Sequence, residues 1–149
     1  MKSFRKKRPI CEDFKKTLSQ TEEGAVLANV LEGGLKAVSL TSHLSLSTAF
    51  SNDAEPSAVF AQQAFVLGDK GDTLIAISTS GNSKNCVYAV AVAKAKGIKT
   101  VALTGEKESK LSKLCDVCIR VPETETYKIQ ELHLPIYHCL CAMLESELF

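Results

Sequence analysis

The chain has 149 residues, of which 45% are hydrophobic and 23% are charged, and its formal net charge is +1. This balance is typical of one globular domain and gives no general attraction to nucleic acid. No apolar run reaches the roughly 18 residues that a membrane-spanning helix needs, and no signal-peptide core follows the start, so we expect a cytoplasmic protein without a membrane partner.

The one cluster of like charge lies at the start of the chain, in "MKSFRKKRP". No aromatic or amphipathic pattern accompanies it, so we interpret it as a solvated N-terminal segment rather than a nucleic-acid or membrane patch. The following segment, residues 11–34, predicts one or two helices, the second spanning about residues 22–31 and ending at Gly33.

From residue 35 onward, short apolar runs alternate with longer helical patterns, which indicates an α/β protein. Residues 35–40 predict a first strand, and the Ser/Thr-rich residues 41–53 predict a helix or a loop. A further helix is expected from near Pro56 to Gly68.

The run "DTLIAIS", residues 72–78, is almost continuously apolar, as expected of a central parallel strand that is covered on both faces. An Ala-rich helix follows and is expected to end at Gly97 with a glycine cap. The remaining predicted elements are a strand at 98–105, a short charged helix at 106–114, a strand at 115–122 and a helix from about 125 to 148 that contains Pro135.

Six cysteines fit a reducing compartment as free thiols. Cys115 and Cys118 form a "CDVC" pair, but their surroundings predict a strand, in which positions i and i+3 point to opposite faces. No second pair completes a four-ligand zinc site, so we interpret these thiols as structural.

The segment "STSGNS", residues 78–83, lies between a predicted strand and a predicted helix, where parallel sheets bind their ligands. Hydroxyl groups, a glycine and the amides of a helix N-terminus supply donors for an anion, and a phosphate ester fits them. Asn82 or Ser83 is alternatively an ordinary helix cap. A cap needs one such residue, whereas five of these six are Ser, Thr or Asn, which favours a ligand.

Other kinds of phosphate loop do not fit this segment. No Lys-Ser or Lys-Thr pair follows a glycine, and no three-glycine dinucleotide fingerprint is present. The sequence therefore predicts a small phosphorylated ligand and no nucleotide cofactor.

The last helix contains "IQELHLPIYH", in which Gln130, Leu134 and His138 are spaced i, i+4, i+8 and share one face. On this spacing alone, a packed structural histidine is the more natural interpretation of His138.

Three segments together, "GDTLIAISTSGNSKN", "AKAKGIKTVALTG" and "IRVPETETYKIQELHLPIYHCLCAMLESELF", resemble the sugar isomerase (SIS) domain family and, within it, the phosphoheptose isomerase group. The resemblance covers about residues 35–149 and implies a single domain over 1–149, in which residues 1–34 match less well. It implies a doubly wound, mostly parallel sheet between helices, a three-layer sandwich, assembled as a homotetramer. The implied activity is aldose-ketose isomerisation of sedoheptulose 7-phosphate through an enediolate.

The resemblance also implies roles for single residues. The phosphate-binding residues by position are Ser78, Thr79, Ser80 and Ser83. Asn82 and Gln130 are expected to contact substrate, and Gln130 and His138 match residues that contact a catalytic metal, commonly zinc. His138 is the expected catalytic acid or base, whereas His133 has no matching role and is expected to be structural or at an interface.

The sequence departs from the family pattern in two places. Full-length relatives begin with a helical hairpin and a strand, which supply part of the phosphate site, two metal ligands and the proposed base, and this chain lacks them. We therefore expect an N-terminally incomplete fold with an exposed apolar face and an unpaired edge, less stable than its relatives and prone to associate. Tyr127 stands where the phosphoheptose isomerases often have an acidic residue.

These departures leave other functions open. One alternative is a noncatalytic phosphosugar-binding module or a protein that associates with a replication initiator, which would keep the fold and lose the base and the metal ligands. A further alternative is a nonfunctional remnant of a truncated gene.

Overall fold

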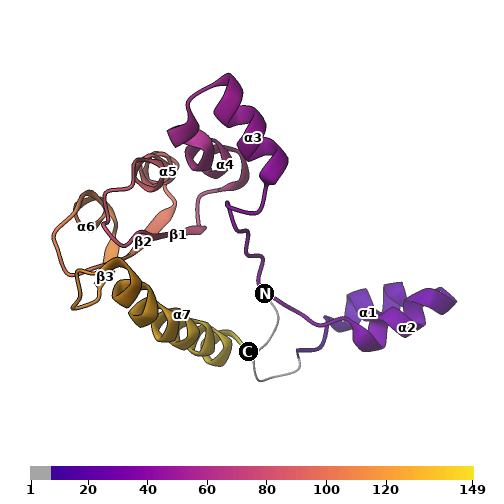
Figure 1. Ribbon diagram of the computed structural model, residues 1–149. Helices are drawn as coiled ribbons and strands as arrows, with labels where there is room; N and C mark the ends of the chain where they lie inside the picture. Colours follow the sequence, from indigo (N-terminus) through magenta and orange to yellow (C-terminus); the bar gives the residue numbers. More distant parts are fainter. Residues whose placement is uncertain (1–7) are drawn as a thin grey trace. The chain divides into compact units, whose positions relative to one another are not determined.

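The computed structural model describes residues 8–149 (Figure 1), and the chain divides into two compact units. The sheet unit comprises Ser39–Tyr137, and the hairpin unit comprises the chain up to Val38 together with His138–Phe149. The assignment of a single domain stays a prediction.

The sheet unit is built on three parallel strands, β1 (Thr73–Ile77), β2 (Lys99–Thr104) and β3 (Val117–Arg120). Their order is β1-β2-β3, so β2 is central and the other two strands form the edges. The register pairs Ile75 with Val101 and Leu103 with Ile119. The predicted α/β class and parallel sheet are confirmed.

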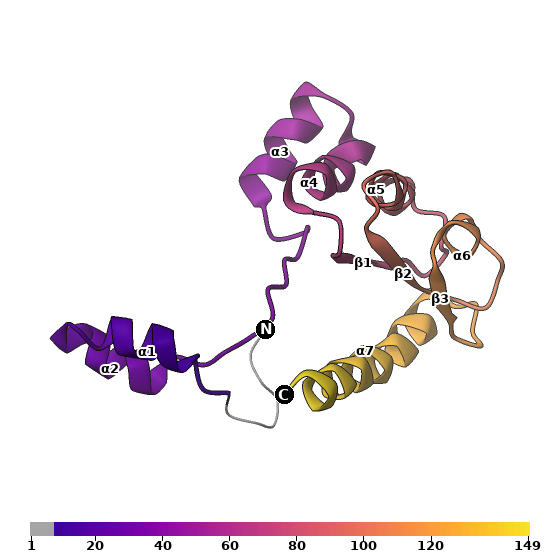
Figure 2. The ribbon, with the colours of Figure 1, turned by 180° about the vertical axis from the view of Figure 1, so that it is seen from behind.

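Helices occupy both sides of this sheet. Helices α4 (Val59–Leu67) and α5 (Lys84–Ala95) lie on one side, and the start of α7 (Thr126–Leu148) lies on the other (Figures 1 and 2). The remaining helices of the unit are α3 (Leu44–Asp53), the short 3-10 helix η1 (Pro56–Ala58) and α6 (Lys110–Leu114). The helices predicted after Pro56 and after Ser83 and the long C-terminal helix through Pro135 are therefore present.

The glycine that ends α5 has the predicted function. Gly97 has φ of +73°, a conformation that side chains with a Cβ disfavour. Its amide donates to the Lys94 carbonyl, and the Ile98 amide donates to the Ala93 carbonyl. These two bonds form a Schellman motif, which turns the chain directly into β2.

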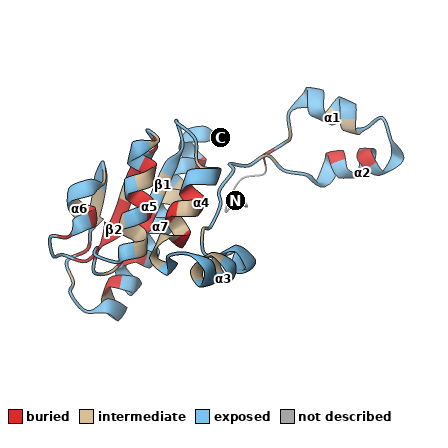
Figure 3. Cartoon of the chain, turned by 90° about the horizontal axis from the view of Figure 1, so that it is seen from above, coloured by how far each residue is buried: buried red, intermediate tan, exposed pale blue. Residues whose placement is uncertain are grey.

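The core of the sheet unit lies between the sheet and α5. Val90 of α5 and Ala102 of β2 are fully buried, and they pack with Ala76 and Leu111. Figure 3 shows buried residues gathered on β2 and α5, whereas α3 has no buried residue.

Cys115 and Cys118 both pack against this core cluster, as does Cys86. The prediction that the first two thiols lie on one strand and point apart was wrong, because Cys115 is the C-cap of α6 and the strand begins only at Val117. Burial raises the pKa of the Cys86 and Cys115 thiols, which keeps them in the unreactive protonated form and agrees with a structural role.

The predicted strand at residues 35–40 is absent. These residues have no regular secondary structure, and Leu35 and Val38 are exposed. A strand requires a neighbour that pairs its backbone, and none of the three strands of the described sheet pairs with this segment.

The prediction that "DTLIAIS" forms a central strand covered on both faces was also wrong. β1 is an edge strand, and Ile75 and Ile77 are 52% and 53% exposed. The expected unpaired edge and exposed apolar face are therefore both present in this strand.

The hairpin unit contains α1 (Glu12–Leu18) and α2 (Glu22–Val30), as its sequence predicts. The Thr21 hydroxyl caps α2 by accepting from the Gly24 amide at 3.1 Å. Pro9 and Glu32 form an antiparallel bridge, which closes the base of the hairpin.

The basic cluster at the start of the chain lies outside the described residues except for Arg8. Arg8 is 7% exposed, and its guanidinium lies 4.3 Å from the centre of the Phe149 ring. The interpretation as a solvated segment is therefore wrong for Arg8, since its planar cation stacks on an aromatic ring. Within residues 8–149, no helix is long and apolar enough to cross a membrane.

Candidate functional site

Residues 78–83, called the phosphate loop after the ligand that the sequence predicts for them, connect β1 to α5 at the carboxyl edge of the sheet. The Ser78 amide donates to the Leu103 carbonyl of β2, which continues the strand pairing into the loop. The Gly81 amide then donates back to the Ser78 carbonyl and closes a tight turn. Gly81 has φ of +63°, so this turn requires a glycine.

The hydroxyl groups of the loop lie at different depths. Ser78 is buried, with its Oγ 3.0 Å from Ser83 Oγ, whereas Ser80 and Ser83 are exposed. Ser83 occupies the N-cap position of α5, yet its side chain accepts no hydrogen bond from the amides of that helix. The loop therefore presents hydroxyls beside a helix N-terminus that they do not cap.

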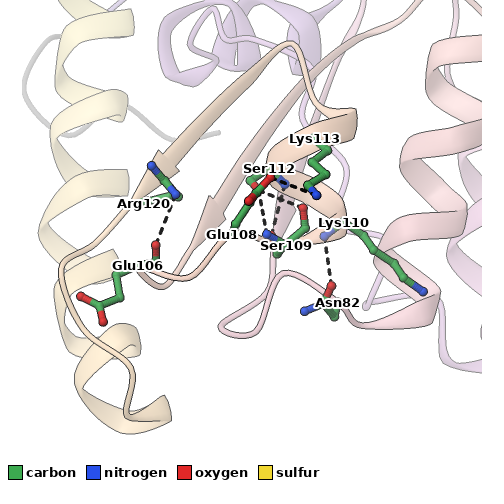
Figure 4. Close-up of polar contacts among 8 residues, drawn as sticks. All are labelled: Asn82, Glu106, Glu108, Ser109, Lys110, Ser112, Lys113 and Arg120. Carbon is green, nitrogen blue, oxygen red and sulfur yellow. Dashed lines mark hydrogen bonds and ion pairs between the residues drawn. The ribbon is translucent and has the colours of Figure 1, made fainter.

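Asn82 does not cap α5 either, because its side chain faces α6. Its Oδ1 accepts from the Lys110 amide at 3.0 Å (Figure 4). Its Nδ2 donates to the Ser80 carbonyl at 3.0 Å. Both ends of the amide are thus bonded within the protein. This geometry suits a residue that shapes the loop, and the predicted substrate contact of Asn82 stays a prediction.

A second contact fixes the loop against α6. The Leu111 amide donates to the Gly81 carbonyl at 3.0 Å. A Cβ at Gly81 would overlap Ser109 Oγ and lie 2.6 Å from Ser109 Cβ, so the Gly81 backbone packs against the Ser109 side chain with no room for a side chain of its own. Sequence analysis missed Ser109, although its spacing to Ser112 at the start of a helical pattern is a capping signal.

Two lysines near the loop pair with carboxylates, whereas the Lys110 amine forms no ion pair among the described residues. Lys84, the first residue of α5, pairs with Glu55 at 3.3 Å, and Lys113 pairs with Glu108 at 3.0 Å. The Glu55 carboxylate raises the pKa of the Lys84 amine, and hydrogen bonds from Ser57 and Lys84 hold the pKa of Glu55 below its usual value. Amides and hydroxyls, rather than a dedicated cation, are the groups that the loop itself offers to an anion.

The residues predicted on the C-terminal helix fall in different environments. Gln130 belongs to the sheet unit and His138 to the hairpin unit, and both are exposed. His133 is 2% exposed, and its Nε2 lies 3.2 Å from the Thr104 carbonyl oxygen. Its burial agrees with the structural position expected for it.

A zinc ion does not fit the donors that these residues supply. Zinc in proteins has three or four side-chain ligands, drawn mainly from Cys, His, Asp and Glu. Across residues 8–149, no group of three or more such side chains lies close enough together to hold a metal. Gln130 and His138 alone do not make a zinc site.

Comparison with known sequences points to one family. Residues 34–145 match the SIS domain family. The chain is 45% identical over 116 residues to the phosphoheptose isomerase of Aneurinibacillus thermoaerophilus. The aligned stretch covers 78% of this chain and 59% of the relative. It is likewise 45% identical to phosphoheptose isomerase 2 of Campylobacter jejuni, over 78% of this chain and 58% of the relative.

Solved structures agree with the sequence comparison. A phosphoheptose isomerase from Neisseria gonorrhoeae superposes with a TM-score of 0.73 at 40% identity, over 75% of this chain and 62% of that one. One from Francisella tularensis gives a TM-score of 0.74 at 33% identity, over 91% of this chain and 69% of that one. The chain thus spans about three fifths of the length of the curated relatives, 59% and 58% in the two cases above.

Proposed function

The chain belongs to the SIS domain family, and on this premise we propose that it binds a sugar phosphate as part of a phosphoheptose isomerase. The names of the relatives support this proposal, as does their identity of 45% to this chain. We further propose that the protein acts in the cytoplasm as a homo-oligomer, a tetramer as in the family.

One observation carries the proposal. Ser83 occupies the N-cap position of α5 without capping it, and Asn82 turns its side chain to α6. The Cys86 amide is bonded to Asn85 Oδ1 at 2.9 Å, whereas neither Ser83 nor Asn82 bonds the first amides of the helix. These first amides, next to the hydroxyls of Thr79, Ser80 and Ser83, suit the oxygens of a phosphate ester. The capping alternative needs a side-chain bond to α5 that neither residue makes.

The proposed reaction interconverts sedoheptulose 7-phosphate and an aldoheptose 7-phosphate. A base removes a proton from C1 of the ketose, the resulting enediolate spans C1 and C2, and an acid returns a proton to C2. The hydroxyl proton moves from the oxygen on C1 to the oxygen on C2. We propose His138 as the group that moves the carbon-bound proton, because imidazole titrates near neutrality, and Gln130 as a donor to a substrate oxygen. Because the described side chains do not form a zinc site, no step is assigned to a metal.

The phosphate role is tested by the double substitution Ser80→Ala with Ser83→Ala. Loss of two donors to a charged phosphate should weaken binding of sedoheptulose 7-phosphate by about 1 to 3 kcal/mol, measured by isothermal titration calorimetry. Ser45→Ala, an exposed serine on α3, is the matched control and should bind normally. Unchanged affinity in the double variant would return the loop to a purely structural role.

The catalytic role is tested separately with His138→Ala. Proton exchange at C1 of sedoheptulose 7-phosphate in deuterated water should stop, while the binding constant stays within about twofold, because the phosphate contacts remain. Full exchange in the variant would remove His138 from the chemistry. Binding without exchange in the unaltered chain would favour the noncatalytic phosphosugar-binding alternative.

A further inference from the structure

His133 is a buried histidine that takes no part in the reaction proposed above. Its side chain is 2% exposed, and Nε2 lies 3.2 Å from the carbonyl oxygen of Thr104. A carbonyl oxygen only accepts hydrogen bonds, so Nε2 must carry the hydrogen and donate it. Nδ1 is buried without a partner among the described residues. The bond to Thr104 is therefore the polar contact that orients this ring.

The Thr104 carbonyl, which accepts from His133, lies next to Gly105, and Gly105 forms a hydrogen bond with the phosphate loop. Thr104 is the last residue of β2, and its hydroxyl donates to the Gly105 carbonyl at 3.1 Å. The Gly105 amide donates to the Thr79 carbonyl at 3.0 Å. The Thr104 carbonyl also accepts from the Val121 amide at 3.0 Å. One short backbone segment thus accepts from α7 and from the residue after β3, and donates to the loop.

Close packing leaves no room for a side chain at Gly105. A Cβ at Gly105 would lie 2.6 Å from Ile129 Cδ1 of α7, 2.8 Å from the Glu123 carbonyl oxygen and 3.1 Å from the Thr79 carbonyl oxygen. Ile129 and His133 are four residues apart on α7 and both are 2% exposed. The same face of the helix therefore packs against the Thr104–Gly105 segment. A displacement of that face must therefore displace the Thr79 peptide.

We propose that His133 is a positioning residue that couples α7 to the phosphate loop. Through Thr104 and Gly105 it fixes the Thr79 carbonyl, and with it the direction of the loop hydroxyls relative to the helix that carries Gln130. The proposal rests on the proposed function in one respect, since it takes the loop as the phosphate site. The coupling between α7 and the loop is expected in the protein without ligand as well, so it can be tested independently of binding.

Three variants separate the hydrogen bond from simple burial. His133→Leu removes the donor and keeps an apolar side chain, whereas His133→Gln restores an N–H donor at the end of the side chain. Gln63→Leu is the matched control, because Gln63 is 1% exposed and its Nε2 donates to the Leu40 carbonyl at 2.9 Å, away from the loop. Each variant is prepared in the full chain.

Two measurements are made on each variant. The first, without ligand, follows the amide signals of residues 79–83 and the hydrogen exchange of the Gly105 amide by NMR. The second is the affinity for sedoheptulose 7-phosphate. His133→Leu should shift the loop signals, accelerate Gly105 exchange and weaken binding about fivefold to tenfold, the worth of one buried hydrogen bond. His133→Gln should largely restore the loop signals, the Gly105 exchange rate and the affinity. Gln63→Leu should lower only the melting temperature.

Several results would overturn the coupling. Loop signals and affinity that are unchanged in His133→Leu would do so, as would equal effects in His133→Leu and His133→Gln. If the unaltered chain binds no sugar phosphate while His133→Leu still shifts the loop signals, the proposed function fails and the coupling stands. If His133→Leu does not fold, the imidazole nitrogen spectrum of the unaltered protein decides: hydrogen on Nε2 supports the coupling, and hydrogen on Nδ1 alone excludes it.

Discussion

At the scale of single residues, Asp116 joins three elements of the sheet unit. Its Oδ2 accepts from the amide and hydroxyl of Thr100, at 2.8 and 2.9 Å, and its Oδ1 lies 3.0 Å from Lys94 Nζ. The Thr100 hydroxyl also accepts from the Asp116 amide at 3.0 Å. The turn before β3 is thereby fastened to β2 and α5.

These contacts predict a pH dependence of stability. The hydrogen bond from Lys94 and those from Thr100 hold the pKa of Asp116 well below its usual range. A carboxyl with a depressed folded-state pKa stabilises the fold above its unfolded pKa and loses that contribution as the pH falls. The stability difference between the unaltered chain and Asp116→Asn should therefore be constant above about pH 5 and shrink below about pH 4.

Urea denaturation at a series of pH values measures this difference. The exposed Glu131 supplies the control, since Glu131→Gln should change stability little at any pH. A difference for Asp116→Asn that grows as the pH falls would contradict the assignment.

The position of the candidate site was predictable from sequence because its signal is local. Residues 78–83 were expected between a strand and a helix and lie between β1 and α5, while their phosphate-binding role stays a prediction. The orientation of Asn82 was not predictable, because its partner, the Lys110 amide, is 28 residues further along the chain. The contact of His133 with Thr104 spans 29 residues and was missed for the same reason.

At the scale of elements, α6 is a short helix that depends on its N-terminal cap. The Ser109 Oγ accepts from the Ser112 amide at 3.2 Å, and Ser112 Oγ accepts from the Ser109 amide at 2.8 Å. A helix this short has too few internal bonds to offset its nucleation, so the reciprocal cap and packing must stabilise it. The same helix holds the phosphate loop through its amides.

The cap can be tested by a double-mutant cycle on Ser109 and Ser112. Ser109→Ala should lower the free energy of unfolding by about 1 kcal/mol, and adding Ser112→Ala should cost less than it does alone, because the two bonds are reciprocal. The cycle is measured by urea denaturation. Strictly additive effects would show that the two hydroxyls act independently.

Of the four predicted strands, three are present and the one at residues 35–40 is not, whereas the predicted helices are present. The helix after Ser83 has its own stop signal at Gly97, and the helix of Glu22–Val30 has its own cap at Thr21. A strand has no such independence, because its backbone is satisfied only by a neighbour. Residues 35–40 have a strand-like composition but no partner in the described sheet, so the strand predicted from that composition does not form.

At the scale of the whole molecule, one face of the sheet leaves large apolar side chains in contact with solvent. Ile75, Ile77 and Val117 are 52%, 53% and 53% exposed. Parallel strands are ordinarily buried on both faces, and an open edge such as β1 is a template for further pairing. We therefore expect the chain to associate at high concentration.

Sedimentation velocity over a range of concentrations measures this association. Ile77→Thr keeps a β-branched side chain and adds a hydroxyl, so it should shift the chain towards the monomer without unfolding the strand. Val26→Thr on α2 changes an equally exposed valine, 63% exposed, and serves as the control. A chain that stays monomeric throughout would contradict the expectation.

The central claim is that the phosphate loop binds the phosphate of a sugar phosphate. The most direct test is an NMR titration of the full chain that follows the amide signals of residues 79–83, first with sedoheptulose 7-phosphate and then with unphosphorylated sedoheptulose. The account predicts saturable shifts of these signals with the phosphorylated sugar and none with the unphosphorylated one. Shifts of equal size with both sugars, or no shifts with either, would contradict it.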